Sequence, residues 1–453
     1  MFRGLDEAVK EIRKADSIRL VSHLDADGIS AASIALSALT RAGKKIHLSI
    51  KRQITPEVIE DLKQEETDLF LFMDLGSGYM ELLEDLKKSC KSGLIVCDHH
   101  IPSKEEVPGI IHINPVLEGK NEDEVSGAGV TYFLAERLDP RNRDLIFLAI
   151  VGAIGDIQDE NWKMGGINRE IVEKAIASGA AEKERGIRLF GRMNRPVHKA
   201  LEYSTNPYIP GISGDESAAI QFLSSLGIEL KKEGSWKSLN DLSEEEMKKL
   251  ATAIICERIR ESEASPEEIF GEIYSINING DRLDAREMAT SLNACGRMEQ
   301  SSVGILSVLG VRPFDNINGI VAGYRKMITK YIKWVKESGP KETEHAFYIN
   351  SGDQIHENFI GTITSICEKS SILDSGKVIF GLAETEDGKV KVSARAPKEI
   401  VGRGLNLKDM MGEVAGDEGH GGGHAAAAGA FIPTGKEKEF IDSCEKYLKN
   451  KLK

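Results

Sequence analysis

The chain has 453 residues, of which 41% are hydrophobic and 29% are charged. This length exceeds one ordinary hydrophobic core, so we expect two or three domains, and the composition excludes a disordered or fibrous protein. The formal net charge of -13 argues against a protein that coats DNA by bulk electrostatics. A local cationic surface, or metal ions held by acidic side chains, could still receive a phosphodiester.

The sequence offers no membrane segment and no disulfide framework. The longest apolar stretch, residues 145–155, is too short to cross a bilayer, and residues 1–16 carry charges where a signal peptide needs an apolar core. We therefore expect a cytoplasmic protein. Six cysteines are scattered without CxxC pairs, which argues against a zinc ribbon and predicts reduced, mostly buried thiols.

The first 180 residues alternate short apolar runs with helical patterns. The runs occur at residues 18–23, 45–51, 68–74, 93–98 and 109–114. This alternation is typical of βαβ units, and it predicts an α/β fold with a mainly parallel sheet. Ligand sites of such sheets lie at the carboxyl ends of the strands.

The rest of the chain predicts two further regions. Residues 186–290 are mainly helical in pattern, with Ser243 and Glu246 at the spacing of a capping box, and we interpret them as an accessory insert. Strand patterns return at residues 345–350, 377–384 and 389–396, which predicts a second, smaller α/β domain. The boundaries we expect are 1–185 for the first domain, 186–290 for the insert, 291–340 for a connecting segment and 341–453 for the last domain.

Acids and imidazoles follow the predicted strands and one apolar helix. Each segment alone equally fits a polar turn or a helix cap after a buried element. Together they would bring carboxylates to one sheet edge, where they would repel without a cation, so the sequence predicts a metal centre. Asp and His suit borderline divalent metals such as Mn and Zn. The residues are His23, Asp25, Asp27, Asp74, Asp98, His99, His100, Asp156 and Asp159.

These segments, in this order, resemble the four motifs of the DHH phosphoesterase superfamily: "SHLDADG", "MDLG", "CDHH" and "GDIQD". The later "GGGH" resembles the DHHA1 partner domain of that superfamily. "SGAGVTYFLAE" at 126–136 and "NACGRM" at 293–298 narrow the resemblance to RecJ-like single-strand-specific exonucleases. With its helical insert, the chain is most similar to the archaeal type, relatives of a nuclease-dead subunit of the eukaryotic replicative helicase. The resemblance covers nearly the whole chain.

The resemblance implies two bound Mn²⁺ ions, with Mg²⁺ as the alternative metal. His23, Asp25 and Asp74 would hold one ion, while the second would be held by Asp27, Asp74, His99 and Asp156. Asp98 would support these ligands, and His100 would contact the scissile phosphate. The resemblance gives Asp159 no role.

The resemblance also implies a substrate-binding set. These residues would hold the terminal phosphate or nearby backbone of the strand: Asn293, Arg297, Arg395, Gly422, Gly423 and His424. Because the glycines precede a helix-like alanine run, we expect backbone N–H groups near a phosphate at a helix N-terminus.

Two cationic stripes recur at steps of three and four residues, which is the spacing of one helix face. Each fits a solvated face or a track for phosphates with aromatic stacking platforms. The first comprises Arg185, Arg188, Arg192 and Arg195, and the second comprises Lys326, Lys330 and Lys333 beside Tyr324, Tyr331 and Trp334.

The function implied by the resemblance is Mn²⁺-dependent hydrolysis of single-stranded DNA from 5′ to 3′, releasing 5′-mononucleotides in DNA replication or repair. One alternative is 3′ to 5′ digestion of single-stranded RNA, and another is hydrolysis of short oligonucleotides or dinucleotides. A third is a replisome scaffold subunit. We also expect residues from about 200 to 290 to contact a partner protein, the GINS complex of the archaeal replicative helicase.

Overall fold

The computed structural model describes residues 2–159, 162–192, 195–204, 207–260, 266–278, 280–313, 315–369, 372–373, 376–386, 388–415 and 420–452. The chain divides into two compact units, Met1–Val321 and Ala322–Lys453. Among the described residues, no helix combines the length and the apolar character needed to span a bilayer. All six cysteines are free thiols, and four of them are buried.

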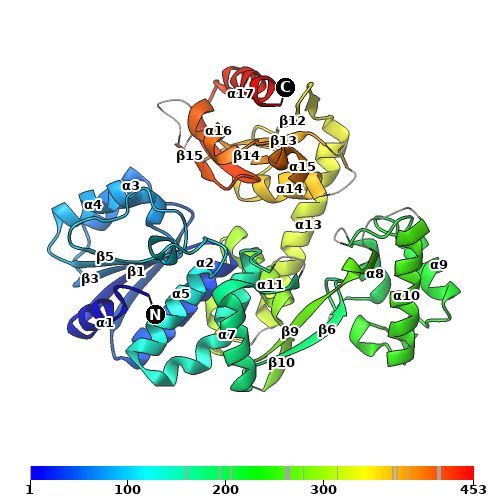
Figure 1. Cartoon of the computed structure of the whole chain (residues 1–453), viewed down its shortest axis with the longest axis horizontal. Helices are drawn as coiled ribbons and strands as arrows, with labels where there is room; N and C mark the ends of the chain where they lie inside the picture. The colour runs from blue at the N-terminus through cyan, green and yellow to red at the C-terminus, as the bar shows by residue number, and fades with distance from the viewer. Residues whose placement is uncertain are drawn as a thin grey trace. The chain divides into compact units, whose positions relative to one another are not determined.

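The first unit is built on a five-stranded parallel sheet, as the alternating pattern predicts (Figure 1). The strand order is β2-β1-β3-β4-β5, and every neighbouring pair is parallel. The predicted α/β fold class is therefore confirmed. The strands are β1 (Ser17–His23), β2 (Lys45–Lys51), β3 (Leu69–Met73), β4 (Gly93–Cys97) and β5 (Ile110–Ile113).

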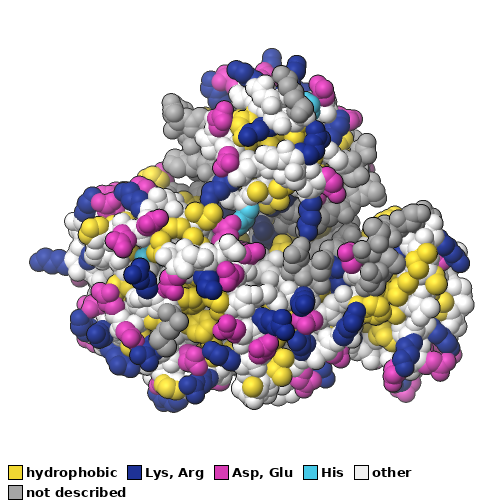
Figure 2. Space-filling model, viewed as in Figure 1, with side chains coloured by type: hydrophobic (Ala, Val, Ile, Leu, Met, Phe, Trp, Pro, Cys, Tyr) yellow, Lys and Arg dark blue, Asp and Glu magenta, His cyan; other side chains and the backbone are white. Residues whose placement is uncertain are grey.

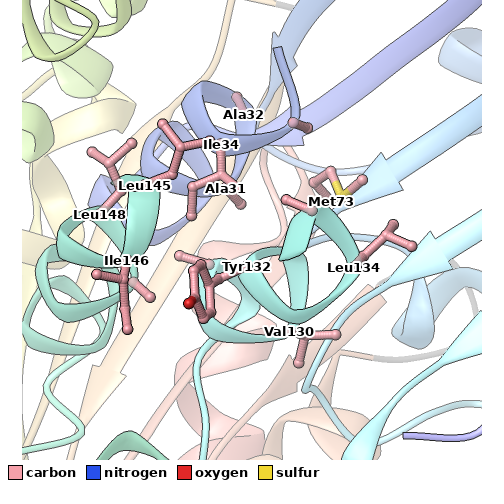
Figure 3. Close-up of a cluster of buried hydrophobic side chains, with 14 of the residues drawn as sticks. Ala31, Ala32, Ile34, Met73, Val130, Tyr132, Leu134, Leu145, Ile146 and Leu148 are labelled. Atoms are coloured by element: carbon pink, nitrogen blue, oxygen red, sulfur yellow. The ribbon is translucent and has the colours of Figure 1, made fainter. Parts of the chain in front are cut away.

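Helices cover both faces of this sheet. They are α1 (Leu5–Lys14), α2 (Ala26–Arg41), α3 (Pro56–Lys63), α4 (Met80–Ser89), α5 (Gly127–Leu138), α6 (Ile146–Gly155) and α7 (Gly166–Ala177). Because successive strand residues point to opposite faces, Leu71 and Met73 join the core beneath α2, α5 and α6, whereas Phe70 and Phe72 pack against α3 and α4. Figure 3 shows labelled side chains of α2, α5 and α6 meeting in the first of these cores.

A smaller antiparallel sheet follows, with strand order β10-β9-β6. It contains β6 (Ala181–Ile187), β9 (Phe270–Ile278) and β10 (Asp281–Asp284). The interpretation of residues 186–290 as mainly helical is thus wrong at the C-terminal end of that range, where β9 and β10 form. Between these strands lie α8 (Val197–Glu202), α9 (Glu216–Ser225), the short strands β7 (Lys231–Lys232) and β8 (Ser235–Trp236), and α10 (Glu244–Arg260). This segment buries a hydrophobic cluster of its own.

The first cationic stripe is not a helix face. Arg185 lies in β6, and Arg188 is a buried residue directly after that strand, with its guanidinium 5.9 Å from the ring centroid of Trp162. Arg192 pairs with Glu184 at 3.0 Å, inside the same region. The spacing of these arginines is therefore not the spacing of a helical phosphate track.

Two helices after β10 return to the core of the first unit, and a third leads into the second unit. They are α11 (Ala285–Arg297), α12 (Ser301–Val308) and α13 (Asp315–Ser338). Met288 and Leu292 of α11 join the same core as α2 and α6. In α13, Lys326, Lys330 and Lys333 are not buried, but Tyr331 is, and the rings of Tyr324 and Tyr331 each lie 5.3 Å from that of Phe359. These two tyrosines therefore pack within the protein instead of offering stacking platforms.

The second unit is a six-stranded sheet with helices, in the order β11-β12-β13-β14-β16-β15. Its elements are β11 (Lys341–Glu342), β12 (Ala346–Asn350), α14 (Glu357–Lys369), β13 (Val378–Glu384), β14 (Lys389–Arg395), α15 (Lys398–Gly402), α16 (Leu407–Val414), β15 (His420–Gly423), β16 (Ala427–Pro433) and α17 (Glu437–Lys451). The helix expected directly after the glycines does not form, because Ala427–Pro433 is a strand that pairs with both β14 and β15.

Candidate metal centre

Two groups of metal-type donors meet at Asp74, at the carboxyl ends of the parallel strands. One consists of His23, Asp25 and Asp74, and the other of Asp27, His99 and Asp156, while a third, overlapping grouping joins Asp74 and His99 to Asp98 and His100. Within each group the donor atoms lie within 4.8 Å of one another. Asp74 Oδ2 lies 3.7 Å from His23 Nδ1, whereas Asp74 Oδ1 lies 3.4 Å from His99 Nε2. The two oxygens of one carboxylate therefore face two different donor groups.

The backbone at Asp74 is strained. Its φ of 53° lies in the left-handed region, which is uncommon for a residue other than glycine. The residue follows β3 directly, and its N–H donates to Cys97 O at 2.8 Å, so the neighbouring strand fixes the turn. Strain of this kind concentrates at functional sites, where the surrounding structure maintains it.

The ring of His99 is oriented by a backbone carbonyl. His99 Nδ1 lies 2.6 Å from Glu122 O, so this nitrogen carries the proton of the neutral ring and Nε2 keeps its lone pair. Nε2 lies 3.6 Å from Asp156 Oδ2 and 3.8 Å from Asp27 Oδ2. In its neutral, metal-binding form, the imidazole would thus present an electron pair from Nε2 on the side of the carboxylates.

Asp27 is held by the N-terminus of α5. The N–H of Gly127 donates to Asp27 Oδ2 at 2.7 Å, and the N–H of Ala128 donates to Oδ1 at 2.9 Å. Amides of the first helical turn have no acceptor within the helix, and a carboxylate satisfies them well. The motif "SGAG" at 126–129 therefore positions a carboxylate of the second donor group. This role was not evident from the sequence.

Asp98 uses its oxygens differently. Oδ1 accepts from His100 Nδ1 at 2.7 Å and from the N–H of His99 at 2.8 Å, and Oδ2 accepts from the N–H of Ser77 at 2.9 Å. Although burial works in the opposite direction, His100 and these donors hold the pKa of Asp98 below its usual range. Asp98 is therefore an ionised residue that orients His100.

Gln158 is a site residue that the sequence analysis missed. Its Nε2 donates to Asp156 Oδ2 at 2.8 Å and to Glu122 O at 3.1 Å, while its Oε1 accepts from Asn168 Nδ2 at 2.6 Å. One amide thus links Asp156 to the carbonyl that orients His99. The available signal was its place in "GDIQD", between two acids at the end of an apolar helix.

Asp159 does not join the donor groups. It is buried and pairs with Arg286 of α11, whose guanidinium carbon lies 4.0 Å from the ring centroid of Trp162. Burial lowers the pKa of Arg286 to about 10. This pair therefore connects the segment after Asp156 to the helix that carries Asn293 and Arg297.

Burial and close contact shift the pKa values of the residues in the donor cluster. Burial, reinforced by Asp74, raises the pKa of Asp27 well above its usual range, and burial also raises the pKa of Asp156. Burial opposes protonation of His23 and His99, yet the neighbouring carboxylates raise the pKa of both imidazoles well above the usual value. The residues as arranged therefore retain protons that a bound cation would displace.

The residues fit a pair of divalent cations. Within the described part of the chain, Asp74 Oδ1 and His99 Nε2 are buried without a hydrogen-bond partner. Buried polar atoms are normally paired, so two such atoms facing each other indicate a missing ligand. Imidazole nitrogen and carboxylate oxygen are donors that Mn²⁺ accepts, and oxygen donors suit Mg²⁺.

The substrate-binding residues expected from the resemblance lie in both units. In the first unit, Asn293 Oδ1 accepts from the N–H of Ala26 at 2.9 Å, beside the donor cluster. Against burial, His23 lowers the pKa of Asp25, and the charge of Arg297 adds a smaller effect in the same direction. In the second unit, Arg395 Nε donates to Ser365 Oγ at 2.7 Å. Gly422 and Gly423 lie in β15, and the exposed His424 follows them in the turn to β16.

Three segments of the sequence match models of known protein families. They are the DHH family, N-terminal domain, over residues 17–153, the DHH-CID domain over 189–269, and the DHHA1 domain over 348–450. An uncharacterised protein of Methanocaldococcus jannaschii is 32% identical over 457 residues, covering 99% of this chain and 97% of the relative. The single-stranded-DNA-specific exonuclease RecJ of Thermus thermophilus is 31% identical over 218 residues, covering 44% of this chain and 31% of that enzyme.

Solved structures share the fold. RecJ from Thermus thermophilus in complex with Mn²⁺ matches with a TM-score of 0.59 at 19% identity, over 99% of this chain and 55% of that one, so this chain spans about half of that protein. CDC45 from Entamoeba histolytica matches with a TM-score of 0.65 at 12% identity, over 98% of both chains. The chain belongs to the DHH family, as a RecJ-like member with DHH, DHH-CID and DHHA1 domains.

Proposed function

We propose that the chain is a metal-dependent exonuclease that hydrolyses phosphodiester bonds of single-stranded DNA, from 5′ to 3′, to 5′-mononucleotides. The observation that carries this proposal is Asp74, whose two oxygens face His23 and His99 in separate donor groups. A carboxylate in this position is suited to bridge two cations. Membership of the DHH family supports a hydrolase, and the RecJ structures with Mn²⁺ and Mg²⁺ support divalent metals.

The proposed ligands follow the two groups. His23, Asp25 and Asp74 would hold one ion, while the second would be held by Asp27, Asp74, His99 and Asp156. Two bound divalent ions supply an activated water and charge stabilisation for phosphoryl transfer.

The remaining residues of the site have supporting tasks. His100, oriented through Nδ1 by Asp98, would donate to a non-bridging phosphate oxygen. Burial lowers the pKa of His100, but Asp98 outweighs it and raises the pKa above the usual value, which favours the donor form. Gln158 keeps Asp156 in place.

The direct test is digestion of end-labelled single-stranded DNA and RNA with Mn²⁺, Mg²⁺ or EDTA, with products resolved by length. We expect mononucleotides to be released from the 5′ end of DNA with a divalent metal, and no product in EDTA. Mononucleotides from the 3′ end of RNA would favour the RNA exonuclease, and cleavage of dinucleotides alone would favour the short-oligonucleotide hydrolase. No hydrolysis with any divalent metal would contradict all three activities.

Arg297, Arg395 and His424 are proposed to bind substrate phosphate, together with Asn293, Gly422 and Gly423. A charge-assisted contact contributes about 1.5 to 3 kcal/mol. Alanine in place of Arg297, Arg395 or His424 is therefore expected to raise KM by roughly 10- to 100-fold with a smaller change in kcat. If only kcat falls, the proposed roles are wrong.

A second candidate function is docking through the insert, and one observation favours it. Among the described residues, the exposed large aromatic side chains are Tyr203, Tyr208 and Trp236, at 55%, 44% and 47% exposure, and all three lie in the insert. Cations flank two of them: Arg195 lies 5.1 Å from the ring centroid of Tyr203, and Lys231 lies 4.6 Å from that of Trp236. Figure 2 shows hydrophobic atoms beside Lys and Arg atoms on this part of the chain. Exposed aromatic and cationic side chains are typical of protein interfaces.

The proposed partner of this surface is the GINS complex. Removing residues 200–290 would also remove β9, β10 and part of the main core, so point variants are the better test. The double variant Tyr203→Ala, Trp236→Ala is expected to weaken GINS binding at least about tenfold and to leave hydrolysis unchanged. Ile176→Ala, an exposed position on α7 outside the insert, is the control. Unchanged GINS affinity of the double variant would refute this surface.

A further inference from the structure

Ile157 has a backbone conformation that isoleucine rarely adopts. Its φ is 61°, in the left-handed region, where a branched Cβ is crowded by its own backbone. The residue closes the C-terminal end of α6, where its N–H donates to Ile154 O at 3.1 Å and the N–H of Gln158 donates to Ala153 O at 2.9 Å. Glycine or asparagine usually fills this position of a helix end.

Burial does not compensate for this strain. The side chain of Ile157 is 71% exposed, so core packing does not explain an isoleucine here. Neither backbone preference nor burial selects the residue. Positions that break local rules without a packing gain are often functional.

The position borders the donor cluster. Ile157 directly follows Asp156, whose Oδ2 lies 3.6 Å from His99 Nε2. Asp27, Asp74 and His99 are buried, whereas His23, Asp25 and Asp156 each keep part of their surface exposed. The cluster is thus open to solvent on its exposed side, and an apolar, conformationally stiff residue follows one of its exposed ligands, Asp156, in the chain.

We propose that Ile157 is a substrate-contacting residue that packs against a nucleobase of the single strand whose phosphate is cleaved. This inference rests on the proposed function. An aliphatic side chain offers no hydrogen bond to a phosphate or sugar hydroxyl, but it packs well on the flat, apolar face of a base. Such a contact tolerates any sequence, and it sets where the strand lies relative to the donor groups.

The variant Ile157→Gly separates this role from a structural one, because it removes the side chain and relieves the strain at once. The contact predicts a higher melting temperature together with a kcat/KM about tenfold lower on single strands. Glu233→Gly is the matched control, since Glu233 also has a left-handed φ, of 53°, but lies in the turn between β7 and β8. It should gain stability and keep full activity.

Substrates with one abasic nucleotide, placed in turn at the first three positions from the cleaved end, identify the base. In the wild type, one position should lower kcat/KM and affinity about tenfold, and in Ile157→Gly the same position should have no further effect. Affinity is measured by fluorescence anisotropy with Ca²⁺. Equal hydrolysis by Ile157→Gly and wild type would refute the contact between Ile157 and a base. Additive effects of the variant and the abasic site would refute it too. Either result would leave the proposed exonuclease function standing.

The same experiment distinguishes the two proposals. A wild type that binds the strand without cleaving it contradicts the exonuclease, while the affinity comparison still decides the contact. A wild type that neither binds nor cleaves overturns both.

Discussion

The backbone of Gly127 lies directly against the carboxylate of Asp74. A Cβ at Gly127 would lie less than 3.0 Å from Asp74 Oδ1, closer than real Cβ contacts. The N–H of the same glycine donates to Asp27 Oδ2. One residue without a side chain therefore positions carboxylates from both donor groups.

The first prediction is that Gly127→Ala lowers both metal affinity and hydrolysis by about 10- to 100-fold, the usual effect of displacing metal ligands through their supports. Isothermal titration with Mn²⁺ and single-strand digestion measure the two effects. Gly412→Ala in α16 is the control, because its added methyl group meets no neighbour within 4 Å. Wild-type metal affinity in Gly127→Ala would contradict the close approach to Asp74.

The second prediction concerns Asp74→Asn, which keeps a residue that tolerates the left-handed backbone and removes the charge proposed to bridge two cations. Hydrolysis should fall to background. The metal-free variant should melt at a higher temperature than the wild type, because crowded carboxylates no longer repel. Melting curves in EDTA and in Mn²⁺ test this, and a variant that Mn²⁺ still stabilises as much as the wild type would refute the bridging role.

The sequence was sufficient to predict the main sheet and to group the titratable residues, for a physical reason. Parallel strands all end at one sheet edge, so acids that follow them must meet there. His23, Asp74 and His99 are such residues, and the structure brings them together.

The supporting contacts could not be predicted in this way. Gly127 and Gln158 carry no titratable group, and each acts on residues dozens of positions away in the chain. Their roles arise from three-dimensional packing, which short-range patterns do not encode.

Two secondary-structure predictions were wrong for identifiable reasons. β10 is a short edge strand rich in charged residues, and such strands lack the apolar alternation of central strands. In β16, pairing with strands on both sides overrides the helical preference of alanine.

The third prediction concerns the pair Asp159 and Arg286. Asp159→Ala should lower the free energy of unfolding by about 3 kcal/mol, because it leaves a mostly buried guanidinium without its carboxylate. The double variant Asp159→Leu, Arg286→Met should recover most of this loss. Urea unfolding of the wild type, of Asp159→Leu, of Arg286→Met and of the double variant gives the coupling energy. Additive losses would show that the pair does not stabilise the segment after Asp156.

The fourth prediction is that His100→Ala lowers the hydrolysis rate by about 10²- to 10³-fold, the effect of losing one hydrogen-bond donor to the transition state. Metal content, counted by mass spectrometry, should remain close to normal. Asp98→Asn should shift the alkaline limb of the rate profile to lower pH, because Asp98 raises the pKa of His100. His47→Ala, an exposed histidine in β2, is the control. Loss of metal from His100→Ala would contradict this prediction and show that His100 is a metal ligand.

The last prediction links metal binding to pH. In the metal-free protein, the pKa values of Asp27, Asp156, His23 and His99 are raised. The folded state therefore binds more protons than the unfolded state, so these groups stabilise the fold at low pH. Their contribution to the stability of the fold is lost as pH rises. The loss begins above the unperturbed pKa of the acids and, for the imidazoles, above the unperturbed pKa of about 6.5.

A bound divalent cation displaces these protons and neutralises the carboxylates, so it should stabilise the protein more strongly at higher pH. Melting temperatures in EDTA should fall from pH 6 to pH 9, whereas those in Mg²⁺ should change less, so the difference widens with pH. The pKa values of Asp25 and Asp98 are lowered, so these residues make stability rise with pH. They do so only in acid, below the range from pH 6 to pH 9. A difference that stays constant from pH 6 to pH 9 would mean that the cation does not bind at these residues.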